Sequence, residues 1–254
     1  MASNCLLFLL LQAISAMFGK YVYVEKQKNW NDAQDHCRKK YTDLAPISNE
    51  YDFNLLFEQT NADRKHDSIW IGLMRDPANT EQWLWSGGCK VVRTFWREGQ
   101  PDNHKNQEDK GQIYKDLTWN DIKGTATSTF FCYKVHVVRE KKTWEEALDH
   151  CRRHHRDLAS VASETELMLM KKELGTLTEA ITEHVWIGLR FLAEDWLWVD
   201  GQPLEYEAWG LEGKPWCPML QRCAALQVTV VNGTTDVTQW NARQCDDELH
   251  FLCY

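Results

Sequence analysis

Two short segments in the first half of the chain concentrate side chains with oxygen donors. One contains Gln100, Asp102 and Glu108, and the other contains Asn120 and Asp121. Calcium takes six to eight oxygen ligands, several of them carboxylates, at distances of about 2.3–2.6 Å. Five such side chains, three of them anionic, therefore suggest a calcium site. Asp, Asn and Gln are also common in solvated turns, so neither segment identifies a metal site by itself.

Other potentially reactive residues have simpler interpretations. His150, His154 and His155 cluster in the sequence, and the first two share a helical face, but such histidines more often belong to a solvated helix surface. Glu108 and Asp109 are adjacent, and adjacent carboxylates rarely flank one scissile bond. The sequence has no Ser/His/Asp order, nucleophile elbow or phosphate-binding loop, so an enzyme is not expected.

The composition narrows the range of partners. The chain has 254 residues, 43% of them apolar, which fits one large or two ordinary domains with packed cores. Its net charge is −8 and it has no dense basic run. Nucleic acid and anionic membrane surfaces are therefore not expected as partners.

The N-terminal segment has the pattern of an export signal. Residues 5–11 read CLLFLLL, and small and apolar residues continue to Gly19. This predicts a cleaved signal peptide over residues 1–19 and a secreted, extracellular protein. An uncleaved anchor is the alternative, but Gln12 shortens the apolar stretch below the ~20 residues of a membrane helix, and no second stretch follows. The sequon at Asn232 predicts a glycosylation site, which is consistent with export.

The chain contains nine cysteines. Cys5 lies in the predicted signal, which leaves eight in the mature chain. In an exported protein this even set predicts a disulfide framework. Eight cysteines can pair in many ways, so the count leaves the pairing open.

The chain repeats the same short motifs in the same order. Each copy has a tryptophan seven residues before a cysteine, then Asp-Leu-Ala, Trp-Ile-Gly-Leu, Trp-Leu-Trp, Trp-Asn and a final cysteine. This self-similarity predicts two homologous domains, 20–133 and 134–254. No Gly-, Ser- or Pro-rich linker separates them, so the two domains should pack closely.

Local signals place two helices early in each copy. Asn29 can cap the first helix of the first copy, and a capping box beginning at Thr143 opens its counterpart. A second helix follows Ser48, and its counterpart begins with a capping box at Ser163. The later half of each copy has short apolar runs, Gly and Pro without a helical period, which predicts short strands and long loops. These loops must position the oxygen donors of the first copy.

The motifs and their spacing resemble the C-type lectin domain family. The resemblance covers residues 20–254 and is nearest to soluble tandem members and to the mannose-receptor group. It implies an α+β fold of two tandem C-type lectin domains, each with two helices, small antiparallel sheets and a long calcium-binding loop region. In the first copy it rests on these segments: Trp30 to Cys37, Trp70 to Leu73, Trp83 to Trp85, Gln100 to Asp102, Trp119 to Asp121, and Cys132.

The resemblance also implies three disulfide bonds. In each domain, the family joins the cysteine of the first helix to the last cysteine, and it adds a second, inner bridge. The matching pairs are Cys37–Cys132, Cys151–Cys253 and the inner bridge Cys223–Cys245. In the first domain the inner-bridge positions hold Lys110 and Gly124, so its loop region is expected to be looser.

Two cysteines, Cys89 and Cys217, remain outside these pairs. An unpaired thiol rarely persists in an exported protein, so each is expected to find a partner. An intrachain Cys89–Cys217 bridge is the favoured interpretation, because it would fix the arrangement of domains that lack a linker. The alternative is a bridge to a second chain, which would give a disulfide-linked homodimer.

The resemblance assigns a role to the oxygen donors of the first domain. Their spacing matches the ligands of the family's sugar-site calcium ion. Two neighbouring sugar hydroxyls would complete the calcium shell and hydrogen-bond to the same side chains. Pro101 stands where the family has a cis-proline. The metal-binding and sugar-binding candidates are Gln100, Asp102, Glu108, Asn120 and Asp121.

The type of sugar follows from one motif. In this family Gln-Pro-Asp goes with galactose-type sugars and Glu-Pro-Asn with mannose-type sugars. His104 stands where galactose binders usually carry a stacking tryptophan, and it is a further sugar-binding candidate. Glycans with terminal galactose-type sugars are the expected partners, and mannose-type glycans are a weaker expectation.

The second domain departs from the ligand pattern. Lys214 and Trp216 flank its proline, Gln221 replaces the next acid, and Ala242 follows the surviving Asn241. Its calcium site is therefore expected to be lost, which leaves a structural or protein-binding role. For the whole chain we expect a secreted, calcium-dependent galactose-type lectin, with innate immune recognition as one role. A calcium-independent protein-binding or ice-binding member of the same fold is the alternative.

Overall fold

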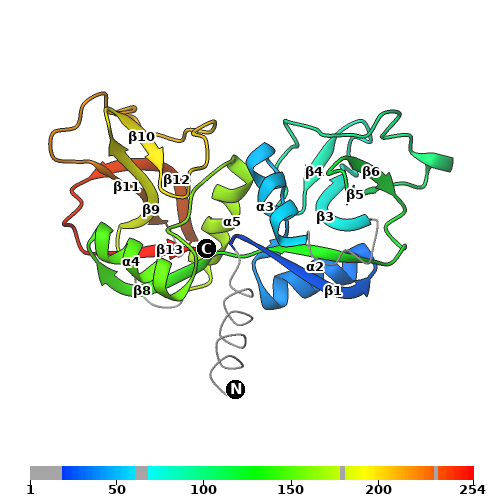
Figure 1. Ribbon diagram of the computed structural model, residues 1–254, viewed down its shortest axis with the longest axis horizontal. Helices are drawn as coiled ribbons and strands as arrows, with labels where there is room; N and C mark the ends of the chain where they lie inside the picture. The colour runs from blue at the N-terminus through cyan, green and yellow to red at the C-terminus, as the bar shows by residue number, and fades with distance from the viewer. Residues whose placement is uncertain (1–18, 61–67, 178–180, 232–233) are drawn as a thin grey trace, which may run out of the picture.

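The protein contains two α+β domains that lie side by side (Figure 1). The computed structural model describes residues 19–60, 68–177, 181–231 and 234–254. The predicted signal peptide lies outside these residues except for Gly19, and so does Asn232 of the sequon. Within the described residues, no helix has both the length and the apolar character needed to cross a membrane.

The first domain forms one sheet flanked by two helices. Its strands follow the order β1-β7-β3-β5-β6, with β2 beside β7 and β4 beside β3. The β3–β7 pair is parallel and the other described pairs are antiparallel. Its elements are β1 (Tyr21–Lys28), α2 (Trp30–Lys40), β2 (Asp43–Leu44), α3 (Glu50–Thr60), β3 (Ser68–Arg75), β4 (Trp83–Trp85), the 3₁₀ helix η1 (His104–Asn106), β5 (Lys110–Tyr114), β6 (Trp119–Ile122) and β7 (Ser128–Tyr133).

The second domain repeats this arrangement. Its strands follow the order β12-β11-β9-β13-β8, with β10 beside β9, and only the β13–β9 pair is parallel among the described pairs. Its elements are β8 (His136–Lys142), α4 (Trp144–His154), α5 (Glu164–Gly175), β9 (His184–Leu192), β10 (Asp195–Trp198), β11 (Cys223–Val231), β12 (Thr234–Arg243) and β13 (Leu249–Cys253). The predicted fold class is confirmed.

The first helix of each domain begins at the predicted cap. The Asn29 side chain accepts a hydrogen bond from the Asp32 amide (2.9 Å), and the Thr143 capping box is complete. Each helix then buries residues at i, i+3 and i+7, so one face packs against the sheet. These buried residues are Trp30, Ala33 and Cys37 in α2, and Trp144, Ala147 and Cys151 in α4.

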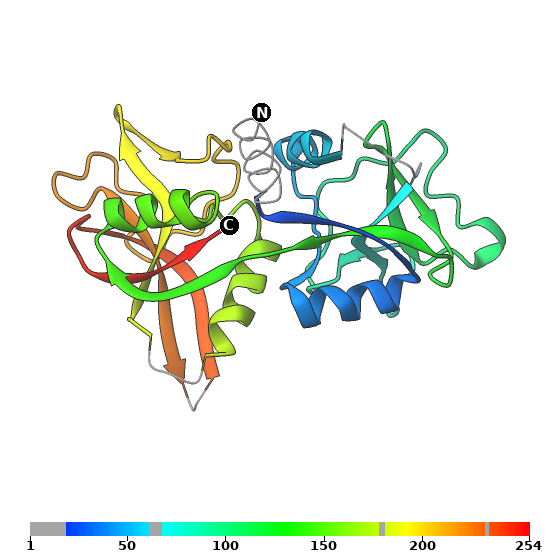
Figure 2. The same ribbon diagram turned by 60° about the horizontal axis from the view of Figure 1, so that its bottom comes forward.

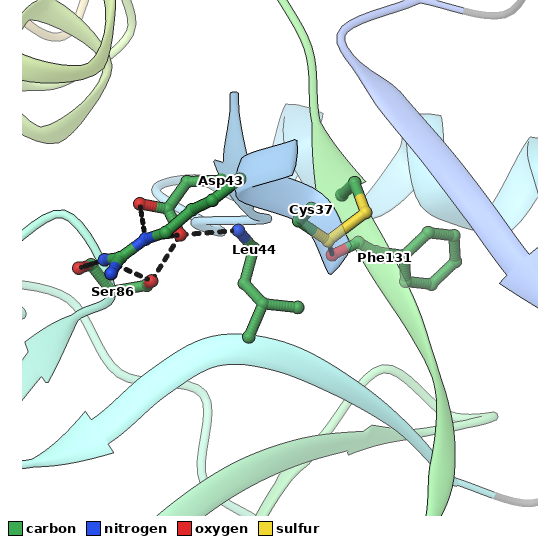
Figure 3. Close-up of a disulfide and its surroundings, with 7 residues drawn as sticks. Cys37, Asp43, Leu44, Ser86 and Phe131 are labelled. Atoms are coloured by element: carbon green, nitrogen blue, oxygen red, sulfur yellow. Dashed lines mark hydrogen bonds and ion pairs between the residues drawn. A yellow bond between two sulfur atoms is a disulfide. The ribbon is translucent and has the colours of Figure 1, made fainter. Parts of the chain in front are cut away.

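A disulfide between Cys37 and Cys132 ties α2 to β7 (Figure 3). The buried Asp43 lies nearby, where its Oδ1 accepts hydrogen bonds from the Leu44 amide (2.8 Å) and the Ser86 hydroxyl (2.5 Å). These contacts hold the end of α2, strands β2 and β7, and the turn after β4 together.

The three disulfides of the structure are the pairs implied by the resemblance: Cys37–Cys132, Cys151–Cys253 and Cys223–Cys245. The predicted Cys89–Cys217 bridge is wrong for this structure, because both thiols are unpaired. Cys89 is half-buried beside Thr165 of α5, where burial raises the pKa of its thiol. Cys217 is exposed in the loop between β10 and β11.

The two domains share one buried apolar cluster. The chain passes from β7 into β8 as a nearly continuous extended segment (Figure 2). At the domain contact, Lys20 is buried, and its Nζ pairs with Asp52 of α3 (2.6 Å) and Glu166 of α5 (2.7 Å). The two domains therefore pack closely, as the absence of a flexible linker in the sequence predicts.

The same ion pair modifies a predicted cap. The Ser163 hydroxyl accepts from the Glu166 amide (3.2 Å), as a capping box requires. The Glu166 carboxylate, however, accepts from the Ala162 amide (3.0 Å) and from Lys20. Only half of the predicted capping box forms, because this carboxylate is used at the domain contact.

Candidate calcium and carbohydrate site

The oxygen donors of the first domain come from the loop before β5 and from β6. The Gln100–Pro101 peptide bond is cis, and Asp102 follows it. Glu108 lies after η1, just before β5. In the β5–β6 pair, Gly111 is opposite Asp121. The hairpin thus brings the end of the loop next to the two polar residues of β6.

Three carboxylates converge at this point. One oxygen each from Asp102, Glu108 and Asp121 lie within 4.8 Å of one another. Asp121 is fully buried, Glu108 is half-buried and Asp102 is exposed, so the group opens to solvent on one side. Carboxylates this close repel one another unless a cation or proton is shared. This donor set fits calcium, which prefers several carboxylate oxygens.

The carboxylate of Asp121 is held on both oxygens. Its Oδ1 accepts from the Asp102 amide (3.1 Å), and its Oδ2 accepts from the Asn103 amide (3.0 Å). Its Oδ2 also pairs with the Arg75 guanidinium (2.9 Å). The loop is therefore anchored to β6 through main-chain donors as well as through charge.

Glu108 faces the same point from the other side. Its Oε2 accepts from the His104 amide (2.9 Å), and its own amide donates to the Asn103 side chain (3.2 Å). Burial and the neighbouring carboxylates of Asp102 and Asp121 raise the pKa of Glu108. A bound cation would relieve this unfavourable charge.

Two amide side chains border the carboxylates. The Gln100 Oε1 accepts from the Asp102 amide (3.3 Å). Asn120 precedes Asp121 on β6, and its Nδ2 donates to the Asp121 carbonyl (2.5 Å). Each amide carries an oxygen suited to an ion and N–H groups suited to a hydroxyl. The side chain of His104, at the start of η1, is exposed next to this group.

Sequence reasoning missed Arg75, which lies at the end of β3. Its guanidinium contacts Asp121 and the main chain of two loops. The only sequence signal is its place two residues after the Trp70–Leu73 motif.

Lys110 and Gly124 occupy the inner-bridge positions. Lys110 pairs with Ile122 in the β5–β6 register, just as Cys223 pairs with Arg243 in β11–β12. A Cβ built on Gly124 would lie 2.8 Å from the Lys110 Cγ. The two residues are therefore neighbours at the place where the second domain has its inner bridge.

Asp109 joins these positions without a covalent bond. Its carboxylate accepts from the Gly124 amide (3.1 Å) and pairs with the Lys110 Nζ (2.7 Å). The same Nζ lies 4.9 Å from the centre of the Trp30 ring, a cation–π contact. An open groove of about 860 Å³ runs alongside, lined by Asp32, Asn106, Glu108, Asp109, Lys123 and others.

The second domain lacks the converging carboxylates among its described residues. Lys214 pairs with Glu207 (3.0 Å), and the Pro215 carbonyl accepts from the Trp196 indole (2.9 Å). On β12, Asn241 and Ala242 pair with the alanines of β11. Ala242 thus takes the place of Asp121, and Lys214 puts a cation where the first domain has the neutral Gln100.

Comparison with known proteins agrees with this architecture. The family model described as Lectin C-type domain matches residues 26–134 and 140–254. A C-type lectin mannose-binding isoform from Oxyuranus scutellatus is 35% identical over 118 residues, covering 44% of this chain and 74% of the relative. A C-type lectin galactose-binding isoform from Hoplocephalus stephensii is 32% identical, covering 46% of this chain and 77% of the relative.

One longer relative matches over both domains. C-type mannose receptor 2 from Rattus norvegicus is 23% identical over 89% of this chain but only 17% of its own length. Among solved structures, the C-type lectin CEL-I from Cucumaria echinata is 27% identical with a TM-score of 0.41, covering 44% of this chain and 89% of that chain. Domains of this family bind carbohydrate and are not catalytic. The protein therefore belongs to the C-type lectin domain family, with two such domains in tandem.

Proposed function

We propose that this protein is a secreted lectin whose first domain binds sugar in a calcium-dependent manner. One observation carries the proposal: the carboxylates of Asp102, Glu108 and Asp121 converge within 4.8 Å. Gln100 and Asn120 border them and complete a set of five oxygen donors. The innate immune role expected from the sequence remains part of this proposal.

The five side chains would serve the ion and the sugar together. Calcium, when bound, supplies open coordination positions for two neighbouring hydroxyls of one sugar ring. The carboxylate oxygens of Asp102 and Glu108 accept hydrogen bonds from those hydroxyls. The Nδ2 and Nε2 groups of Asn120 and Gln100 donate to the hydroxyl oxygens. The arrangement of these donors and acceptors around the two hydroxyls then selects the orientation of the sugar.

The order Gln100-Pro101-Asp102 supports a galactose-type sugar. It places an amide donor before the proline and a carboxylate acceptor after it, the reverse of the mannose-type order. The two snake relatives carry both names, mannose-binding and galactose-binding, so relatedness does not select between them. Terminal galactose-type glycans are the proposed partners, and His104 would border the bound ring.

The second domain is proposed to be structural or protein-binding. We propose domain limits of 20–133 and 134–254 after a signal peptide over residues 1–19. Asn232, which lies between β11 and β12 in the sequence, is the proposed glycosylation site. With Lys214 and Ala242 at two of the ligand positions, this domain is not expected to hold calcium.

We also propose a homodimer linked through Cys217. Cys89 is half-buried at the domain contact, whereas Cys217 is exposed. Large apolar side chains are exposed around it in the same loop: Leu211, Trp216, Met219 and Leu220. On non-reducing electrophoresis the purified protein should run as a dimer, and Cys217→Ser should convert it to a monomer. A wild-type monomer would contradict the dimer.

The test of the main function is a glycan array probed with and without a calcium chelator. Calorimetry should find one calcium per chain, with a dissociation constant on the order of 0.1–1 mM, in the range of extracellular modules. Asp121→Asn or Glu108→Gln should abolish calcium and sugar binding together. Asp116→Asn is the matched control, because the Asp116 carboxylate accepts hydrogen bonds from Thr118 in the β5–β6 turn and is not one of the candidate ligands.

The outcomes separate the proposal from its alternative. Binding that survives chelation would favour a calcium-independent protein-binding or ice-binding member of the fold. Two calcium ions per chain at sugar-type sites, or calcium binding undiminished in Asp121→Asn, would contradict the proposed difference between the domains. Better competition by mannose than by galactose would contradict the sugar assignment alone.

A further inference from the structure

The Arg75 side chain connects three separate segments around the candidate site. Its Nη2 donates to Asp121 Oδ2 on β6 (2.9 Å). Its Nε donates to the Glu108 carbonyl (3.1 Å), and its Nη1 donates to the Thr80 carbonyl (2.7 Å). The guanidinium carbon lies 4.5 Å from the centre of the Trp83 ring. Since the side chain is only 12% exposed, this arrangement is a fixed internal contact.

The charge of Arg75 suits its position. The three converging carboxylates carry three negative charges when ionised, and the guanidinium offsets one of them. The remaining two match one divalent cation. A guanidinium keeps its charge at any ordinary pH and offers donors in a fixed planar fork, so it can stay in place whether or not an ion is bound.

The second domain provides an internal comparison. Counted from the Trp-Ile-Gly-Leu motif, the position of Arg75 is taken by Phe191. Phe191 packs on Trp196 (5.7 Å between ring centres), as Arg75 packs on Trp83. The packing is thus common to both domains, whereas the charge occurs only in the domain that has the carboxylates.

We propose that Arg75 is a positioning residue, a built-in cation that holds the calcium-binding loop in its ligand geometry before the ion arrives. The inference rests on the proposed calcium site. Arg75 joins the Thr80 loop, the end of the 99–109 loop and β6, so the carboxylates remain together in the ion-free protein. Calcium binding then requires little further ordering of the chain, which favours affinity.

Hydrogen exchange on the full-length protein in excess chelator tests this role. In the wild type, the amides of Asp102, Asn103 and His104 should be protected, because each donates to a carboxylate of the site. In Arg75→Met these amides should exchange at least about tenfold faster, because the loop loses its anchor. Arg75→Lys should behave similarly, because one ammonium group cannot reproduce the fork. Arg93→Met, an exposed arginine that pairs with Glu205, should exchange like the wild type.

Added calcium provides the second readout. Saturating calcium should restore protection in Arg75→Met, and the calcium affinity of this variant should fall about tenfold, the cost of ordering the loop on binding. A purely structural role would leave the loop unprotected with and without calcium. Exchange of β11 and β12 reports whether the protein remains folded, and if Arg75→Met does not fold, Arg75→Lys carries the comparison.

Three results would overturn the inference: unchanged exchange in chelator, no restoration at calcium concentrations that saturate the wild type, or tighter calcium binding by the variant. The chelator comparison needs no calcium binding. A wild type that binds no calcium would therefore reject the proposed function, while unchanged exchange in Arg75→Met would reject the role of Arg75 alone.

Discussion

Restoring an inner disulfide in the first domain should stabilise it. The change is the pair Lys110→Cys and Gly124→Cys. Lys110 has the strand register of Cys223, and Gly124 comes two residues after its partner Ile122 as Cys245 comes two residues after Arg243. The Cα atoms of Cys223 and Cys245 lie 5.2 Å apart. A Cβ on Gly124 would lie 2.8 Å from the present Lys110 Cγ, so a sulfur at that Cγ position would be within bonding reach of a second cysteine.

The magnitude follows from the loop that the bridge would close. A loop of about 15 residues is worth roughly 3 kcal/mol in the chain-entropy treatment. The substitution removes the contact of the largely buried Lys110 with Trp30, worth about 1 kcal/mol. It also removes the Lys110–Asp109 pair, in which the Asp109 side chain is 53% exposed, worth well under about 1 kcal/mol. The net gain should be about 2 kcal/mol.

Urea unfolding and thermal melting of the oxidised proteins measure this gain, because reductant would also open the three existing bridges. The oxidised double variant should melt about 4–8 °C above the wild type, given about 2–4 °C per kcal/mol for a chain of this size. The single variants Lys110→Cys and Gly124→Cys are the controls and should melt no higher than the wild type. A double variant that forms no bridge, or that forms it and melts below the wild type, would refute the assignment of these positions.

Three further predictions concern separate parts of the molecule. Lys20→Met should cost about 3–5 kcal/mol in urea unfolding, because it leaves Asp52 and Glu166 buried without their cation; Lys20→Arg, which keeps the charge, should cost less, and equal losses would argue against the ion pair. Burial, with Lys134 and His155 nearby, lowers the pKa of His136 to about 4, so the folded state favours neutral imidazole. Stability should therefore fall as pH drops from about 6.5 towards 4, and a melting series of wild type against His136→Gln should show a flatter pH dependence in the variant. His104→Trp should sharpen galactose preference over mannose in sugar competition by adding a stacking face, and an unchanged ratio would remove residue 104 from the sugar site.

The fold was predictable because its signals are local and repeated. The caps at Asn29 and Thr143, the buried face of each first helix and the repeated tryptophan motifs each specify a short piece of structure. Their repetition in the same order showed that two copies of one fold were present. Even the loss of the inner bridge was readable, because Lys110 and Gly124 depart from the pattern together.

The contacts between distant segments were not predictable. Nothing in the sequence around Lys20 indicates that its ammonium group would lie between acids on α3 and α5. The half-formed capping box at Ser163 has the same origin, since Glu166 is used at the domain contact. The cysteine interpretation failed for the same reason: without the domain arrangement, the burial of Cys89 and the exposure of Cys217 could not be compared.

The two domains hold the same hairpin by different means. In the second domain the Cys223–Cys245 bridge ties β11 to the segment after β12 and needs no ion. In the first domain Asp109 joins the equivalent positions without a covalent bond, while Arg75 and the main-chain donors to Asp121 hold the loop. A bound calcium ion would add to these non-covalent contacts in the first domain alone. Chelation should therefore lower protection from hydrogen exchange around β5 and β6 relative to the calcium-loaded protein and leave β11 and β12 unaffected, whereas an equal loss in both domains would contradict this division of roles.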